Sequence, residues 1–135
     1  MKKLLLPLFA CFALVSAVFA ADAAAPAKIA DISLADLKTA IAAGKVSVID
    51  VNGSASYAAG HIPGAIDFAV NKDKLASVLP EDKSALVVAY CGSSKCGAYK
   101  KAANAAVKLG YTNVKHFSGG ISGWKSAGEP TEAAK

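Results

Sequence analysis

The chain has 135 residues, enough for one compact domain and too few for two. Its 15 basic residues are all lysines, spread singly or in pairs, and its formal net charge is +5. This distribution lacks the dense basic stripe that holds a nucleic-acid backbone, so we expect no nucleic-acid partner.

The first 20 residues have the pattern of a secretory signal peptide. Two lysines precede an apolar run of 16 residues from Leu4 to Phe19, and small residues surround a cleavage point after Ala20. The run is shorter than the ~20 apolar residues of a membrane-spanning helix. We therefore expect residues 1–20 to be removed, which lowers the charge from +5 to +3 with the loss of Lys2 and Lys3. The mature protein should be periplasmic or secreted, with no membrane attachment after cleavage.

Composition also suggests the domain limits. Residues 21–28 (ADAAAPAK) contain alanine and proline without a periodic apolar face, which predicts a flexible linker. Residues 29–130 hold the alternating pattern of a folded domain, and residues 131–135 form a C-terminal tail. We expect the segment from Glu129 onward to be as loose as the linker.

Short apolar strands alternate with helices along the domain. Ser33 and Asp36 form a capping box that begins a helix, and Gly44 ends it. Residues 84–90 (SALVVAY) have no polar face, which is typical of a strand covered on both sides. The other expected strands are residues 45–51, 65–70 and 113–117, and the other expected helices are residues 54–60, 72–79, 96–109 and 120–128. This alternation predicts an α/β fold with a parallel sheet and helices on both faces.

The stretch AYCGSSKCG, residues 89–97, places Cys91 directly after the predicted buried strand. Functional groups of an open α/β sheet gather at this edge, where strands lead into helices. Because the next residues are small, the backbone N–H groups of the loop can curve around the sulfur. These groups and Lys95 favour an ionised thiolate, the nucleophilic form of cysteine. We therefore expect Cys91 to be reactive.

The second cysteine of this stretch, Cys96, leaves other chemistries open. If residues 1–20 are removed, Cys91 and Cys96 are the two cysteines that remain, an even number that suits an oxidising compartment. They could form an inert disulfide, although a cross-link across so short a loop adds little stability. Two cysteines without further ligands fall short of a structural zinc site, so we expect no metal and no cofactor.

Three stretches together resemble the signatures of the single-domain rhodanese family. They are VIDVNGSASYAAGHIPGAIDFAV (48–70), AYCGSSKCG (89–97) and FSGGISGWKSAGEP (117–130), in the family's order and spacing. The resemblance implies a central parallel sheet of five strands and a thiosulfate sulfurtransferase activity. It implies that Cys91 takes sulfane sulfur from a donor as a persulfide and passes it to a nucleophile. The substrate-binding positions that it implies are Gly92, Ser93, Ser94, Lys95, Cys96 and Gly97.

The chain departs from the family pattern at three positions. Ser94 stands where glycine is frequent, Cys96 where threonine, serine or arginine is common, and Asn52 where many members have arginine. Related dual-specificity phosphatases need an arginine at the seventh position of a Cys-x5-Arg loop to bind phosphate. That position is Gly97 here, and the chain has no arginine, so phosphatase activity is excluded.

The expected partners are a small sulfur anion as donor and a thiol acceptor or redox partner protein, with the chain as a monomer or homodimer. Two alternatives remain: a thiol–disulfide redox protein in which Cys96 resolves intermediates on Cys91, and a non-enzymatic carrier of sulfane sulfur. A reversible Cys91–Cys96 disulfide should block transfer until a thiol opens it. We expect Asp50 to support the active loop or the following helix, and His61 to hydrogen-bond backbone in a turn.

Overall fold

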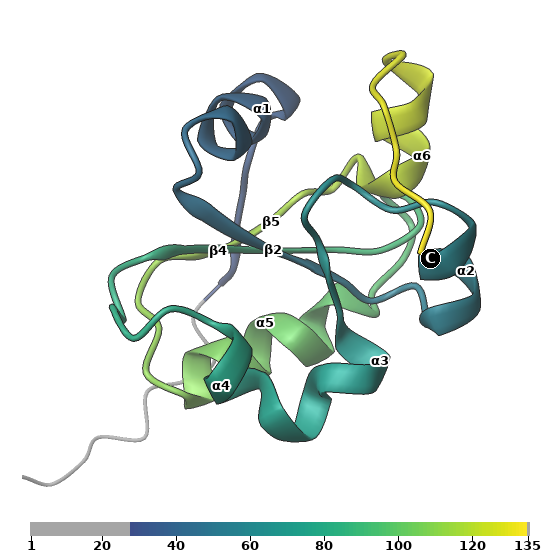
Figure 1. The fold of residues 1–135 in the computed structure, drawn as a ribbon. Helices are drawn as coiled ribbons and strands as arrows, with labels where there is room; N and C mark the ends of the chain where they lie inside the picture. The colour runs from purple at the N-terminus through teal and green to yellow at the C-terminus, as the bar shows by residue number, and fades with distance from the viewer. Residues whose placement is uncertain (1–27, 135) are drawn as a thin grey trace, which may run out of the picture.

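The computed structural model describes residues 28–134; the predicted signal peptide, Cys11 and nearly all of the predicted linker lie outside the described residues. Five strands form one parallel sheet in the order β1-β5-β4-β2-β3 (Figure 1). The strands are β1 (Ala30–Asp31), β2 (Val46–Asp50), β3 (Ile66–Asp67), β4 (Leu86–Tyr90) and β5 (Val114–His116). The helices are α1 (Leu34–Ala42), α2 (Ser54–Ala59), α3 (Phe68–Asn71), η1 (Lys72–Lys74), α4 (Leu75–Val78), α5 (Tyr99–Lys108) and α6 (Gly120–Ser126).

Helices cover both faces of this sheet. In Figure 1, α1 and α6 lie on one side, and α3, α4 and α5 lie on the other. Alternate residues of the central strand β4 face the two cores: Val88 and Tyr90 pack toward Leu37 and Trp124, whereas Val87 and Ala89 pack toward α5. The predicted α/β class, the five-stranded parallel sheet and the double-sided burial of β4 are confirmed.

Local sequence features explain where several elements begin and end. The Ser33 hydroxyl accepts a hydrogen bond from the Asp36 backbone N–H at 3.1 Å, so the predicted capping box is confirmed. Gly44 follows α1 with a φ of 64°, a left-handed conformation that glycine adopts without steric cost. Among residues 28–134, no helix is long and apolar enough to cross a membrane.

Two predicted boundaries were wrong. The strand expected over residues 65–70 is limited to Ile66–Asp67, because the Asp67 carboxylate accepts the Ala69 N–H at 2.9 Å and caps α3. The helix expected from Cys96 begins only at Tyr99, after a turn closed by the Cys96 N–H and the Ser93 carbonyl. Cys96 therefore precedes the helix instead of lying in its first turn.

The C-terminal segment is ordered, contrary to our expectation. The backbone of Glu132 exchanges two hydrogen bonds with His61, at 2.8 and 2.9 Å, and the Ala134 N–H donates to the Ala58 carbonyl. The Trp124 indole N–H donates to the Pro130 carbonyl at 2.7 Å, and its ring is buried. These hydrogen bonds, two from backbone pairing with His61, one to Ala58 and one from the Trp124 side chain, thus hold residues 129–134 against α2 and α6.

Candidate active site

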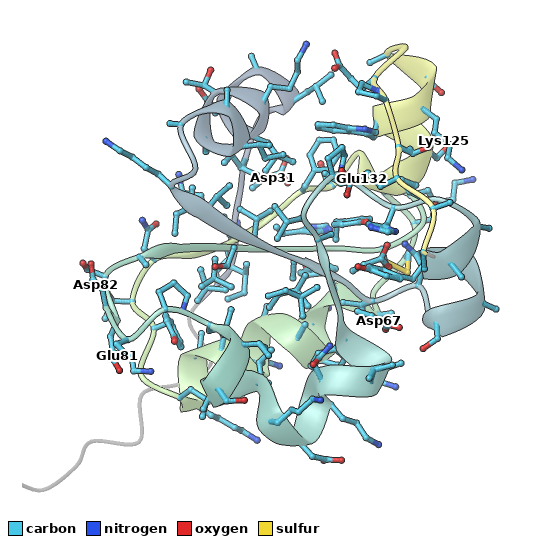
Figure 2. All side chains as sticks on the ribbon, viewed as in Figure 1. Asp31, Asp67, Glu81, Asp82, Lys125 and Glu132 are labelled. Carbon is cyan, nitrogen blue, oxygen red and sulfur yellow. A yellow bond between two sulfur atoms is a disulfide. The ribbon has the colours of Figure 1, made fainter. Side chains whose placement is uncertain are left out.

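Cys91 lies at the carboxyl edge of the sheet, in the first position after the central strand β4. Only 1% of its surface is exposed, whereas Cys96 is partly exposed. The two cysteines are joined by a disulfide with their Cα atoms 6.3 Å apart, which Figure 2 shows as a yellow bond. This separation lies within the roughly 4.4–6.8 Å range of protein disulfides. The structure thus places both predicted sulfurs in one loop, in direct contact.

The start of α6 holds this loop in place through backbone hydrogen bonds. The Ile121 N–H donates to the Cys91 carbonyl at 2.9 Å, and the Ser122 N–H donates to the Gly92 carbonyl at 3.0 Å. Gly120 makes the approach possible: a Cβ there would lie 2.6 Å from the Cys91 carbonyl oxygen. Its φ of 60° also favours glycine. Our sequence reasoning gave Gly120 no role, although the paired glycines before the last helix marked the position.

The loop offers unpaired backbone donors to an anion. The Cys96 N–H is engaged with Ser93, but within residues 28–134 no protein acceptor is found for five other loop N–H groups. These belong to Gly92, Ser93, Ser94, Lys95 and Gly97, of which Ser94, Lys95 and Gly97 are exposed. The structure places all six predicted binding positions on this loop. It can therefore present several N–H donors and one lysine to a small anion.

Asp50 supports the loop indirectly. It ends β2 beside Tyr90, the residue before Cys91, and its buried carboxylate accepts hydrogen bonds from the Tyr90 hydroxyl and from the Asn52 N–H at 2.7 Å. The Tyr90 hydroxyl in turn accepts the Ile62 N–H at 3.1 Å. Burial and the hydrogen bond to Asp50 raise the pKa of Tyr90 well above its ordinary value, so this phenol stays protonated. The Asp50–Tyr90 pair thus fixes the ends of β2 and β4 next to Cys91.

His61 is held away from the loop by other contacts. Its Nδ1 lies 2.8 Å from the Tyr57 carbonyl, and its ring stacks on the Tyr57 ring with centroids 3.7 Å apart. Its Nε2 faces the Glu132 carboxylate at 3.8 Å. His61 therefore joins α2 to the C-terminal segment, and within the described chain it makes no hydrogen bond to the cysteine loop.

A second histidine, His116, packs against the helix that follows the loop. His116, at the end of β5, stacks on Tyr99 in the first turn of α5, with ring centroids 3.4 Å apart. Its Nε2 is buried and, among the described residues, has no hydrogen-bond partner. Burial lowers the pKa of His116, opposed by the Asp31 carboxylate, which raises it. Sequence reasoning missed this stack because its two residues are distant in the chain.

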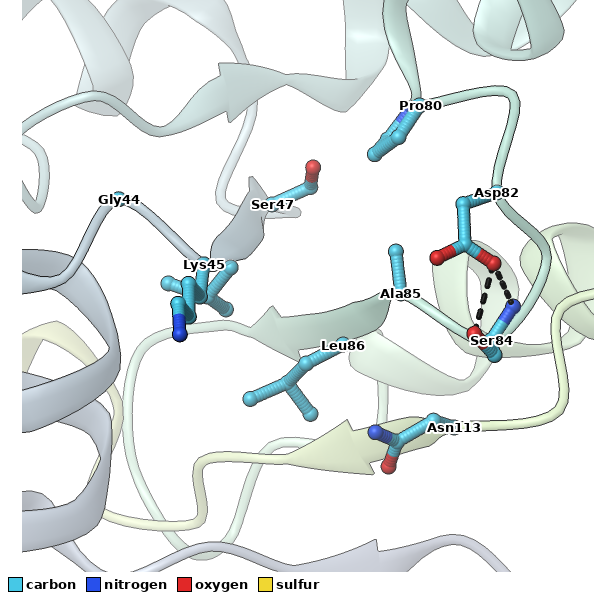
Figure 3. Close-up of a pocket in the computed structure, with 10 residues that line it drawn as sticks. Gly44, Lys45, Ser47, Pro80, Asp82, Ser84, Ala85, Leu86 and Asn113 are labelled. Carbon is cyan, nitrogen blue, oxygen red and sulfur yellow. Dashed lines mark hydrogen bonds between the residues drawn. The ribbon is translucent and has the colours of Figure 1, made fainter.

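One other hollow in the surface of the described residues was compared with the cysteine loop. A pocket of about 500 Å³ lies at the opposite edge of the sheet, at the amino ends of β2 and β4 (Figure 3). Its carboxylate, Asp82, is engaged by the Ser84 N–H and hydroxyl, and these hydrogen bonds lower the pKa of Asp82. Within residues 28–134, no three His, Cys, Asp or Glu side chains cluster as a metal site would require. The cysteine loop is therefore the strongest candidate active site.

The fold and the loop define a class: a parallel α/β domain with a cysteine at the carboxyl edge of its central strand. Comparison with protein families matches residues 33–127 to the rhodanese-like domain. The chain belongs to this family, and its resemblance to single-domain rhodaneses is confirmed.

Relatives with this domain include enzymes and a regulator. The chain is 36% identical over 103 residues to an HTH-type transcriptional regulator of Mycobacterium tuberculosis, covering 75% of this chain but 44% of the regulator. It is 33% identical over 85 residues to the thiosulfate sulfurtransferase GlpE of Pseudoalteromonas translucida, covering 61% and 75% of the two chains. It is 29% identical over 108 residues to the human thiosulfate:glutathione sulfurtransferase, covering 69% and 90%. The family and these two enzymes support a sulfurtransferase role.

Solved structures share the same fold. A human single-domain sulfurtransferase superposes with a TM-score of 0.55 at 26% identity, covering 73% of this chain and 97% of that one. A Bacillus halodurans protein superposes with a TM-score of 0.61 at 27% identity, covering 77% of each chain.

Proposed function

We propose that this protein is an enzyme that takes sulfane sulfur as a Cys91 persulfide and passes it to a thiol or another nucleophile. The observation that carries the proposal is the position of Cys91 at the head of a loop in which five backbone N–H groups have no acceptor among residues 28–134. Oriented N–H groups stabilise a thiolate and the anionic groups of a bound donor.

The donor is a small sulfur anion, thiosulfate or a polysulfide. The Cys91 thiolate attacks the outer sulfur of thiosulfate, an S–S bond forms, and the donor's S–S bond breaks as sulfite leaves with the electron pair. An acceptor thiolate then attacks the outer sulfur of the persulfide, and Cys91 leaves as a thiolate. Lys95, exposed in the loop, supplies the nearby positive charge that an anionic donor needs.

The disulfide makes this activity dependent on reduction. While the Cys91 sulfur is bonded to Cys96, it cannot act as a nucleophile. A thiol reductant that opens the bond restores the Cys91 thiolate. An oxidising location, the periplasm or the exterior of the cell, would favour the closed form, and the chain would act there as a monomer or homodimer.

Turnover with several donors and thiol acceptors tests the proposal. Reduced wild type should transfer sulfur, and Cys91→Ser should lose all transfer because no other described thiol lies where Cys91 does. Cys96→Ser should retain transfer and no longer need prior reduction. Near-normal turnover by Cys91→Ser would contradict the assignment.

The disulfide also favours a second candidate, a thiol–disulfide redox protein. In that case the reduced protein would reduce a disulfide substrate without any sulfane sulfur donor, and both cysteines would be required. Assaying reduced wild type against a disulfide peptide, with and without thiosulfate, separates the two functions.

A further inference from the structure

The second cysteine of the loop reaches the sulfur atom that would carry a persulfide. The disulfide joins Cys96 Sγ to Cys91 Sγ itself, across a turn closed by the Cys96 N–H and the Ser93 carbonyl at 3.0 Å. In a Cys91 persulfide, this Sγ is the inner sulfur, and the sulfur received from the donor is the outer one. The loop therefore brings a thiol to the inner sulfur without any larger rearrangement of the fold.

In the disulfide form, this inner sulfur is shielded from solution. Cys91 is 1% exposed, and its backbone is covered by the first turn of α6 through the Ile121 hydrogen bond and the close approach of Gly120. Cys96 is partly exposed, and the neighbouring Lys95 is exposed. An acceptor from solution should thus meet the outer sulfur, whereas Cys96 is the nucleophile placed at the inner one.

Building on the proposed function, we propose that Cys96 resolves the Cys91 persulfide and releases sulfide. The Cys96 thiolate attacks Cys91 Sγ and forms the Sγ–Sγ bond seen in the structure. The bond between Cys91 Sγ and the outer sulfur breaks, and the outer sulfur leaves with the electron pair as hydrosulfide. The two cysteines are oxidised to the disulfide and the sulfane sulfur is reduced to sulfide, so no outside oxidant is required.

A dithiol reductant, or two equivalents of a monothiol, completes the cycle. It attacks the sulfur of Cys96, the more exposed of the two cysteines, and Cys91 leaves as a thiolate beside the loop N–H groups that have no acceptor within residues 28–134. A second thiol then releases Cys96. The net reaction converts a sulfane sulfur donor and a dithiol into sulfide, a disulfide and the rest of the donor, a reductase activity in addition to transfer.

A single turnover without air tests this step. Two full-length proteins carry Cys11→Ser so that only the loop thiols are counted: one keeps Cys96 and is called wild type in this experiment, and the other carries Cys96→Ser. Both are reduced, desalted and mixed with one equivalent of thiosulfate. Wild type should release equal amounts of sulfite and sulfide, and its mass should fall by about 2 Da as the disulfide closes. Cys96→Ser should release sulfite but no sulfide, and its mass should rise by about 32 Da, one sulfur atom.

The outcomes separate this inference from the function on which it rests. Wild type that keeps the added sulfur and releases no sulfide would overturn the resolving step while leaving the transferase intact. Absence of sulfite from both proteins would overturn the transferase as well. Sulfide release by Cys96→Ser at the wild-type level would also exclude Cys96 as the resolving thiol. If Cys96→Ser is unfolded by circular dichroism, Cys96→Ala replaces it, and the wild-type mass and sulfide yield still decide.

Discussion

Replacing Gly120 by alanine should both displace the active loop and destabilise the fold. The added Cβ would lie 2.6 Å from the Cys91 carbonyl oxygen and 2.8 Å from both the Gly92 carbonyl carbon and the Ser93 nitrogen. All three are backbone atoms, so no side chain can rotate away to make room. The loop that carries Cys91 must move instead.

The size of the effect follows from two contributions. At a φ of 60°, alanine adopts a left-handed conformation that costs roughly 1–2 kcal/mol. Moving the loop would also break its hydrogen bonds to Ile121 and Ser122, each worth about 1 kcal/mol. A total loss of roughly 3–4 kcal/mol lowers Tm by about 12–16 °C in a domain of this size. A loop displacement of about 1 Å lowers sulfur transfer by about 100-fold.

Gly128→Ala provides the matched control. Gly128 also has a positive φ, 77°, but a Cβ there meets no atom within 4 Å. This variant should therefore lose the conformational contribution alone, roughly 1–2 kcal/mol, and keep its transfer rate. Thermal unfolding and the rate of sulfite release with thiosulfate are measured for both variants. Normal transfer by Gly120→Ala, or an equal loss in Gly128→Ala, would refute the reasoning.

Three further changes test other parts of the site. Lys95→Ala should raise KM for thiosulfate more than it lowers kcat, since the lysine attracts the anion without touching the breaking bond; Lys108→Ala, at the far end of α5, should change neither. Because folding raises the pKa of Tyr90, its contribution to the free energy of unfolding is fully present below the unfolded-state pKa of about 10 and falls at higher pH. Tyr90→Phe should flatten that alkaline decline in urea unfolding. Because folding lowers the pKa of His116, its contribution to the free energy of unfolding is fully present above about pH 6.5 and falls in acid. A His116→Gln variant should lose part of this acid dependence, and an unchanged acid dependence would contradict the reasoning.

Local patterns in the sequence predicted most of the fold. The capping box at Ser33 and the unbroken apolar run at residues 84–90 act through nearest neighbours, so α1 and β4 were predicted within a few residues. The strand β1, only Ala30–Asp31, is too short for periodicity and forms through its pairing with β5. The C-terminal segment is ordered by the backbone pairing of Glu132 with His61. The composition around Glu129 does not indicate this pairing.

For the candidate site as well, the local features were predicted and the contacts between distant residues were missed. Cys91 and its loop were found because one stretch contains the cysteine, the small residues and Lys95. The contacts that position the loop come from elsewhere in the chain: Gly120 lies 29 positions beyond Cys91, and Asp50 lies 40 positions before Tyr90. A single sequence does not reveal such pairs, because no local pattern links their members.

The location of the transferred sulfur tests the central claim most directly. Reduced Cys96→Ser is mixed with thiosulfate, alkylated without reductant and digested with trypsin, which cleaves after Lys83 and Lys95 and releases residues 84–95. Cys91 is the only cysteine in this fragment, so we predict that the fragment carries one additional sulfur, about 32 Da, in proportion to the sulfite released. Sulfite release with an unmodified 84–95 fragment would contradict Cys91 as the sulfur carrier.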